Sequence, residues 1–192
     1  MFKVRQGLRE TEYMPINPGT EQHSLLLLNY KLTNIRPEVM CGIWYRESNF
    51  KLINNPFQFD PPLPVSQQEE ILNAYGANHL TGAARDVALA TGFLEHKCVI
   101  PNEIKGLAPN QPILADAYYG YNGRAFGKAY ENSPYVYNGY DDHHFPMTFI
   151  GTEPDPKNPK NRIKVTIEDR RPGALVVYLQ LMNLNLWRLP NA

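Results

Sequence analysis

One apolar stretch of this 192-residue chain organises the rest: Pro37-Glu38-Val39-Met40-Cys41-Gly42-Ile43-Trp44-Tyr45-Arg46-Glu47-Ser48-Asn49-Phe50. Pro37 suits a first helical position, where its missing N–H needs no partner, and Glu38 places acidic charge in the first turn. Four apolar residues follow at helical spacing: Val39, Met40, Ile43 and Trp44. The stretch therefore predicts a helix from residue 37 to residue 46 or 47, with Glu47 at its C-terminal end.

Helical patterns continue on both sides of this stretch. Residues 21–33 follow Thr20, a good N-cap residue, and are apolar on nearly all sides, which is typical of a buried helix. Ser66 and Glu69 have the spacing of a capping box and predict a short helix to about residue 75. Apolar periodicity predicts three more helices, from about residue 81, over 111–121, and from 172.

The segments between these helices are long and rich in turn-forming residues. Residues 54–64 carry four prolines, 121–149 are rich in Tyr, Gly and Asn, and 151–162 read as an exposed turn region. Residues 163–167 alternate and predict a short strand. We expect a mostly α (α+β) single domain over residues 20–192, with long loops and at most a small β element. Residues 1–19 are expected to form an irregular N-terminal arm.

The charge of the chain argues against some kinds of partner, and its two cysteines leave two possibilities open. The chain has 19 basic and 19 acidic residues, so no net field attracts it to nucleic acid or to an anionic wall. Recognition is therefore expected to come from a groove, with no nucleic-acid partner and no cofactor. Cys41 and Cys98 lie in predicted buried helices; free thiols are expected, and one disulfide is the alternative because spacing does not decide it.

Three motifs occur in order along the chain. The first is Glu47-Ser48-Asn49-Phe50, the second is Pro56-Phe57-Gln58, and the third is Tyr121-Asn122-Gly123, followed by Ser133-Pro134-Tyr135. Together they resemble the goose-type lysozyme and lytic transglycosylase superfamily, particularly the phage-type cell-wall lysozymes. The likeness runs from about residue 23 to residue 183. It departs from the family pattern at Pro56, where Gly is typical, and at Gly120, where Ala is typical.

The resemblance implies a lysozyme-like fold and a role for each matched residue. Glu47 is then the catalytic acid and Tyr121 its orienting neighbour. Substrate-binding roles fall to the remaining matched residues: Ser48, Phe57, Gln58, Asn122 and Tyr135. The implied partner is the glycan strand of peptidoglycan.

Elementary chemistry supports the assignment of Glu47 independently. Glycoside cleavage needs a carboxylic acid that stays protonated near neutral pH. A helix C-terminus disfavours the carboxylate, and the aromatic residues Trp44, Phe50 and Tyr121 would remove water from it. Both effects would raise the pKa of Glu47. The alternative is that Glu47 is an ordinary solvated residue at a helix end.

Asp60 is the best candidate for a second carboxylate. An inverting hydrolase needs a base to activate water, whereas a lytic transglycosylase uses the 6-hydroxyl of the sugar itself. Asp60 precedes Pro61, so a structural role in a turn is the alternative. The run Asp141-Asp142-His143-His144 suggests a metal, but adjacent residues rarely converge on one ion, and we expect no metal site.

The resulting hypothesis is a muramidase that cleaves the β-1,4 bond between N-acetylmuramic acid and N-acetylglucosamine, with a lytic transglycosylase favoured over a hydrolase. The first alternative is an inactive lysozyme-like structural or binding component of a phage tail or injection particle. The second is a chitinase-like activity. The start of the chain lacks the apolar core of a signal peptide, and Leu25 to Leu28 is too short for a membrane span. We therefore expect synthesis in the cytoplasm, no membrane insertion, and delivery to the wall by phage-type release or by a particle.

Overall fold

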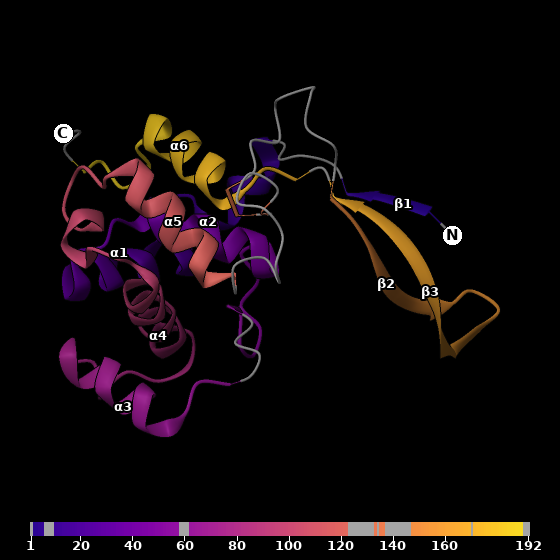
Figure 1. Cartoon of the computed structure of the whole chain (residues 1–192), viewed down its shortest axis with the longest axis horizontal. Helices are drawn as coiled ribbons and strands as arrows, with labels where there is room; N and C mark the ends of the chain where they lie inside the picture. The colour runs from indigo at the N-terminus through magenta and orange to yellow at the C-terminus, as the bar shows by residue number, and fades with distance from the viewer. Residues whose placement is uncertain are drawn as a thin grey trace.

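Helix α2 (Pro37–Ser48) lies at the centre of the computed structural model, which describes residues 2–5, 10–57, 62–122, 133, 135–136, 147–169 and 171–189. Every residue of α2 except Glu47 is buried. The architecture is mostly helical with a small sheet, as expected (Figure 1). The other helices are α1 (Glu21–Thr33), α3 (Val65–Ala74), α4 (Gly82–Lys97), α5 (Gln111–Tyr121) and α6 (Ala174–Leu184), with 3-10 helices η1 (Glu10–Ile16) and η2 (Pro101–Ile104).

The helix predictions were correct in position but not in every detail. Thr20 caps α1 as expected, accepting a hydrogen bond from the backbone N–H of His23 at 3.3 Å. The prediction that α1 is buried was wrong: Leu26 is fully buried, but Leu28 is 38% exposed. Four consecutive leucines cover all sides of a helix, so composition alone could not tell which side meets the core. The predicted capping box was also wrong, because α3 begins at Val65 and Ser66 falls inside its first turn.

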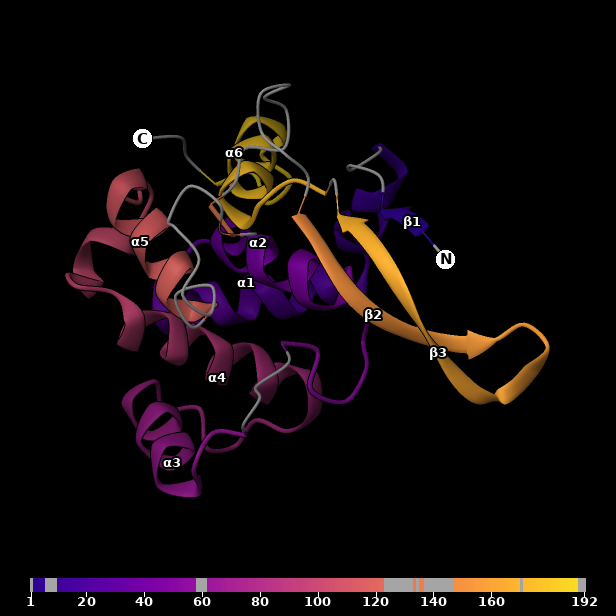
Figure 2. The same ribbon diagram turned by 45° about the vertical axis from the view of Figure 1, so that its right-hand side comes forward.

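A three-stranded sheet stands beside the helices. Its strands are β1 (Phe2–Arg5), β2 (Met147–Asp155) and β3 (Asn158–Asp169), in the order β1-β3-β2. Strand β3 pairs with β1 in parallel and with β2 in antiparallel fashion. Figures 1 and 2 both show the long β2–β3 hairpin projecting away from the helical body.

The sheet corrects two sequence predictions. The arm at residues 1–19 is not irregular throughout, since it contains β1 and η1, and the turn region at 151–162 is mostly strand. A four-residue strand such as β1 forms its hydrogen bonds with a strand far away in the sequence, so no local sequence pattern predicts it. The prolines of this region argued against strands in the sequence. Pro154 lies on edge strand β2, next to a register irregularity, where the missing N–H of a proline is tolerated.

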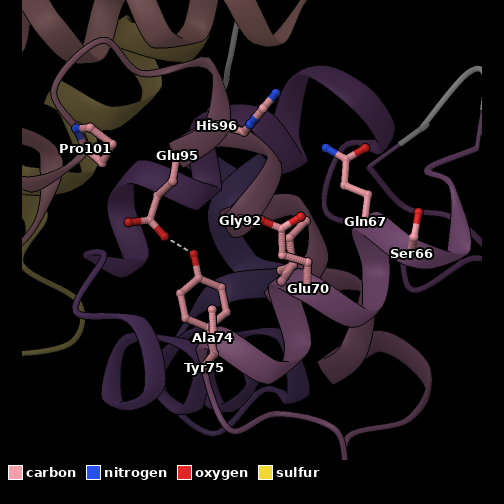
Figure 3. Close-up of a pocket in the computed structure, with 10 residues that line it drawn as sticks. Ser66, Gln67, Glu70, Ala74, Tyr75, Gly92, Glu95, His96 and Pro101 are labelled. Atoms are coloured by element: carbon pink, nitrogen blue, oxygen red, sulfur yellow. Dashed lines mark hydrogen bonds between the residues drawn. The ribbon is translucent and has the colours of Figure 1, made fainter.

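A second, smaller apolar cluster forms where α3 packs on α4. Beside it, the two helices and the start of η2 enclose an open hollow of about 570 Å³ (Figure 3). The Tyr75 hydroxyl donates to the Glu95 carboxylate in this hollow, and Lys105 Nζ lies 2.5 Å from the other oxygen of Glu95. Burial and the bond to Glu95 raise the pKa of Tyr75. Both carboxylate oxygens of Glu95 thus have a partner within the protein.

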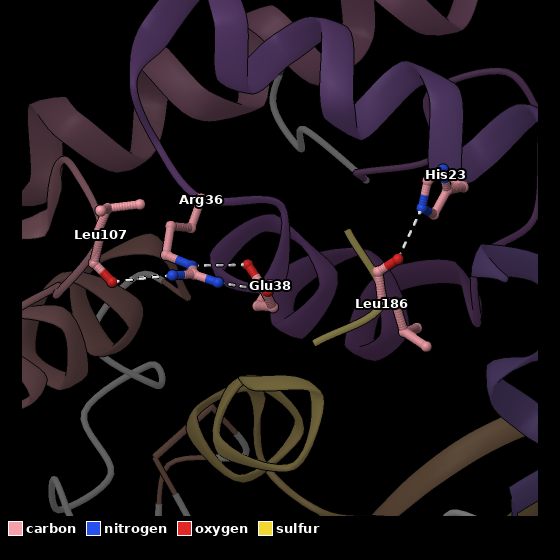
Figure 4. A network of polar contacts seen from close by, with 5 residues as sticks. All are labelled: His23, Arg36, Glu38, Leu107 and Leu186. Atoms are coloured by element: carbon pink, nitrogen blue, oxygen red, sulfur yellow. Dashed lines mark hydrogen bonds and ion pairs between the residues drawn. The ribbon is translucent and has the colours of Figure 1, made fainter. Parts of the chain in front are cut away.

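A buried ion pair fixes the start of α2. The Arg36 guanidinium donates from Nε and Nη2 to the two oxygens of Glu38, at 3.0 and 2.9 Å, and from Nη1 to the Leu107 carbonyl at 3.0 Å (Figure 4). Both charged side chains are completely buried. Across the core, His23 Nε2 donates to the Leu186 carbonyl at 3.3 Å and ties α1 to the end of the chain (Figure 4). The Arg36 contacts thus anchor the first turn of α2 in the core.

Two further observations concern the cysteines and the length of the helices. Cys41 and Cys98 are both free and buried, as expected. Within the described part of the chain, no helix is both long and apolar enough to cross a membrane.

Close contact between α2 and α6 depends on Gly42. A Cβ atom at Gly42 would lie 2.4 Å from the backbone oxygen of Ala174, far inside contact distance. We predict that Gly42→Ala lowers the free energy of unfolding by about 2 kcal/mol, because a backbone atom cannot move aside as a side chain can. Urea denaturation measures this loss.

Gly120→Ala in α5 is the matched control for that substitution. Its Cβ would lie 3.1 Å from the Cβ of Lys97 and 3.5 Å from the Lys97 backbone oxygen, so a far smaller shift of the neighbour is enough to admit it than at Gly42. The control is expected to lose less than half as much stability. Equal losses in the two variants would contradict the close packing of α2 on α6.

Candidate active site around Glu47

The chain turns sharply directly after α2, close to Glu47. Asn49 and Phe50 both have left-handed backbone conformations, with φ of 55° and 60°. For Phe50 this conformation costs roughly 1–2 kcal/mol. The Phe50 ring is fully buried against Trp44, with ring centroids 6.4 Å apart. Trp44 Nε1 also donates to the Lys51 carbonyl at 3.2 Å, so the core holds the strained turn in place.

Two tyrosines gather at the Glu47 carboxylate. The hydroxyl of Tyr135 donates to Glu47 Oε1. The rings of Tyr121 and Tyr135 stack with centroids 6.0 Å apart, and the Tyr121 hydroxyl makes a long hydrogen bond of 3.5 Å to the Phe57 carbonyl. Tyr121 is near enough that the charge of Glu47 raises its pKa further, after the larger effect of burial. The motifs at residues 47, 121 and 135 therefore meet in space.

One of the two tyrosines differs from the role that the resemblance gave it. The Tyr135 hydroxyl donates to Glu47, and Tyr121, the expected orienting neighbour, lies close enough for the charge of Glu47 to act on its pKa. Tyr135 was expected to bind saccharide, but it is only 2% exposed, so it belongs to the surroundings of Glu47. The Tyr121 ring is also held by an edge-on contact with the Phe93 ring, 5.1 Å away between centroids.

Burial raises the pKa of Glu47 from 4.5 to about 7. The guanidinium groups of Arg46 and Arg171 act in the opposite direction and only partly offset this effect. An acid with a pKa near 7 is divided between its two forms at neutral pH, which suits it to give up and recover a proton. The sequence-based expectation of a raised pKa is supported, with desolvation as its main cause.

The structure places the other predicted site residues in different surroundings. Phe57 was expected to bind substrate, which is wrong for its side chain: the ring is fully buried and packs on Trp44, with centroids 5.4 Å apart. An apolar ring gains more from that contact than from solvent. Ser48 is 9% exposed, and its hydroxyl finds no hydrogen-bond partner among the described residues. Asn122 is half-buried at the C-terminal end of α5. Gln58 and Asp60 lie outside the described residues.

Arg46 and Arg171 are parts of the site that the sequence did not reveal. Arg46 is 8% exposed, and its Nη1 donates to the carbonyls of Arg171 and Pro172 at 3.3 and 3.4 Å. The guanidinium of Arg171 lies over the Tyr45 ring, 5.8 Å from its centroid. Arg46 precedes Glu47 directly, which was a visible signal. No such sequence signal exists for Arg171, because only the folding of the chain brings it close to Glu47.

No second chemical centre accompanies Glu47 in the described part of the chain. Those residues contain no group of three or more His, Cys, Asp or Glu side chains that could hold a metal ion. The run from Asp141 to His144 lies outside them. Glu47 is not among the residues that line the hollow between α3 and α4.

Comparisons with known proteins give no relative from which a function could be transferred. No protein-family model, no curated protein and no solved structure matches the chain. The function must therefore be argued from the site alone.

The raised pKa makes a prediction about stability. Below pH 4.5 Glu47 is protonated whether the chain is folded or unfolded; as the pH rises from 4.5 to about 7, only the folded chain keeps the proton. Folding therefore loses stability over this interval, and the cost is complete above it. We predict that Glu47→Gln raises the free energy of unfolding by about 2–3 kcal/mol more at alkaline than at acidic pH.

Urea denaturation at a series of pH values measures this difference. Glu69→Gln, which removes an exposed carboxylate from α3, is the control for the loss of one negative charge. If both variants change stability with the same pH profile, Glu47 is not desolvated as described.

Proposed function

We propose that the chain is a muramidase of the lysozyme-like type, which cleaves the β-1,4 bond between N-acetylmuramic acid and N-acetylglucosamine. The observation that carries the proposal is the half-buried Glu47 with a pKa near 7, to which Tyr135 donates a hydrogen bond. A glycosidase needs such an acid to protonate the leaving oxygen. Three sequence motifs also resemble those of the goose-type lysozyme and lytic transglycosylase superfamily, and residues 121 and 135 of the third lie near this carboxylate.

In the proposed reaction Glu47 acts twice. Its proton passes to the bridging oxygen as the bond from that oxygen to the anomeric carbon breaks. The resulting carboxylate then accepts a proton, and the Tyr135 hydroxyl, already aimed at Oε1, stabilises the charged form in the interval. The buried guanidinium of Arg46 further favours the charged form. Glu47 thereby returns to its starting state.

A lytic transglycosylase is favoured over a hydrolase. Among the described residues, the charges that shift the pKa of Glu47 belong to two arginines and to no carboxylate. An inverting hydrolase places its base roughly 6.5–9.5 Å from the acid. A lytic transglycosylase needs no such base: the 6-hydroxyl of the muramic acid attacks the anomeric carbon, gives its proton to Glu47, and leaves a 1,6-anhydro end. No added nucleophile is needed.

Digestion of purified peptidoglycan tests the proposal. The soluble fragments are separated by liquid chromatography and identified by mass spectrometry. Wild-type protein is expected to release fragments with 1,6-anhydro ends, and Glu47→Gln to lower the rate by about 100-fold or more. The rate should fall above about pH 7, where Glu47 loses its proton. Glu69→Gln is the control and should retain activity.

Each contrary result would favour one of the alternative functions. Fragments with reducing ends in place of anhydro ends would replace the lytic version with a hydrolase. Faster cleavage of chitin oligomers than of peptidoglycan would indicate the chitinase-like alternative. If wild type and Glu47→Gln are equally inert on peptidoglycan from several bacteria, the enzyme proposal fails and a structural or binding component takes its place.

A further inference from the structure

Helix α4 carries a phenylalanine whose ring touches the aromatic side chains around Glu47. The Phe93 ring meets the Tyr121 ring of α5 in a T-shaped contact, with centroids 5.1 Å apart and ring planes at 76°. Tyr121 in turn stacks on Tyr135, whose hydroxyl donates to Glu47. A continuous row of contacts therefore runs from α4 to the carboxylate.

Phe93 is itself fixed in place. It is half-buried and packs against both the main core and the smaller apolar cluster. Lys97, four residues later and so on the same face of α4, places its ammonium over the ring, 4.7 Å from the centroid. The neighbouring Gly92 lets α3 approach α4 closely, because a Cβ there would lie 2.3 Å from the Ile71 side chain. Phe93 is therefore a firm support for the Tyr121 ring.

Tyr135 takes the position of its ring from neighbouring rings. It lies outside the helices and strands of the structure. Its backbone carbonyl accepts a hydrogen bond from the N–H of Leu175 at 3.0 Å, which fixes the main chain but not the rotation of the ring about its side-chain bonds. Two rings of α5 flank it, Tyr118 and Tyr121, with centroids 6.4 and 6.0 Å away. The direction of the Tyr135 hydroxyl thus depends on how firmly these two rings are held.

The two flanking rings are held differently. Tyr118 is fixed by its hydroxyl, which donates to the Val39 carbonyl at 2.5 Å. The hydrogen bond from the Tyr121 hydroxyl to the Phe57 carbonyl is long, at 3.5 Å, and a bond of this length orients a ring weakly. Ring contacts therefore carry a larger share of the positioning of Tyr121, and the contact with Phe93 is one of them.

The charges around Glu47 come from other parts of the chain. Among the described residues, the charged and titratable groups that act on its carboxylate lie on α2, on α5 and in the chain before α6: Arg46, Tyr121, Tyr135 and Arg171. Phe93 carries no charge, and a substitution there alters none of these groups. A change in the pKa of Glu47 in a Phe93 variant must then arise from altered hydration or position of the carboxylate.

We propose that Phe93 is a positioning residue of the candidate active site. Through the two stacked tyrosines it holds the Glu47 carboxylate in one orientation and keeps water away from it. A catalytic acid has to be placed to within a fraction of an ångström, and small displacements caused far from the chemistry lower rates strongly. Loss of the ring would let the stack relax and admit water. The role of Phe93 in catalysis rests on the proposed function, whereas its hold on Glu47 does not.

Phe93→Leu keeps an apolar side chain but removes the ring that meets Tyr121. In a ¹³C NMR titration the midpoint of the Glu47 carboxyl carbon is expected to fall by about one pH unit or more. Burial is the largest cause of the raised pKa, and water that enters the site reverses it. The entering water also takes over the hydrogen bond that Tyr135 gives up, so the loss of that bond does not cancel the fall. Phe93→Tyr, which keeps the ring, should titrate like wild type.

The matched control is Tyr75→Leu, which removes a half-buried ring of α3 beside the hollow (Figure 3). Both rings pack against the smaller apolar cluster, so a general loss of packing is common to the two variants. Only Phe93→Leu is expected to move the Glu47 midpoint. Should Phe93→Leu fail to fold, Phe93→Met, which fills more of the space, takes its place with the same expectation. A midpoint that is unchanged in the Phe93 variant, or lowered equally in the control, overturns the proposal.

Cleavage of peptidoglycan supplies a second readout and separates this proposal from the proposed function. Phe93→Leu is expected to lower kcat roughly tenfold or more with little change in KM, because the acid is displaced while substrate contacts remain. Its rate should also decline from a lower pH than that of wild type, in line with the lowered midpoint. If wild type cleaves peptidoglycan and the Glu47 midpoint does not respond to Phe93, this proposal alone is wrong. A midpoint that follows Phe93 in a protein that cleaves nothing supports the hold on Glu47 and removes the muramidase.

Discussion

A carboxylic acid at the end of a buried helix has to give up part of its water, and this constraint governs the chemistry of the molecule. The burial of α2 leaves Glu47 as its single residue that is not enclosed. The same packing that stabilises the core therefore raises the pKa of Glu47. The core and the candidate site are two consequences of one buried helix.

Several features maintain that burial. The Arg36–Glu38 pair fixes the first turn of α2, and Gly42 lets α6 approach its middle. At the far end, a left-handed turn at Asn49 and Phe50 follows Glu47, whose carboxylate accepts a hydrogen bond from Tyr135. A conformation that Phe50 rarely adopts persists because its buried ring is held by Trp44 and Tyr45. Strain at this point is consistent with a functional turn.

The sequence predicted what depends on local pattern and failed where tertiary contacts decide. Helices α2 and α5 were located almost to the residue, because capping, proline position and apolar spacing agree there. Strand β1 was missed, since its only partner is β3 at the other end of the chain. In the site, Glu47 was found from its motif, and its raised pKa was expected from its aromatic neighbours. That Tyr135 donates to Glu47, and that Arg171 lies nearby, follows from packing that no local spacing encodes.

The protonation of one side chain, Glu47, distinguishes a catalytic acid from an ordinary hydrated carboxylate. A ¹³C NMR titration of the Glu47 carboxyl carbon, assigned by comparison with Glu47→Gln, measures it directly. The structure predicts a titration midpoint near pH 7. A midpoint near the ordinary value of 4.5 would mean that the carboxylate is well hydrated, and the assignment of Glu47 as a catalytic acid would be wrong.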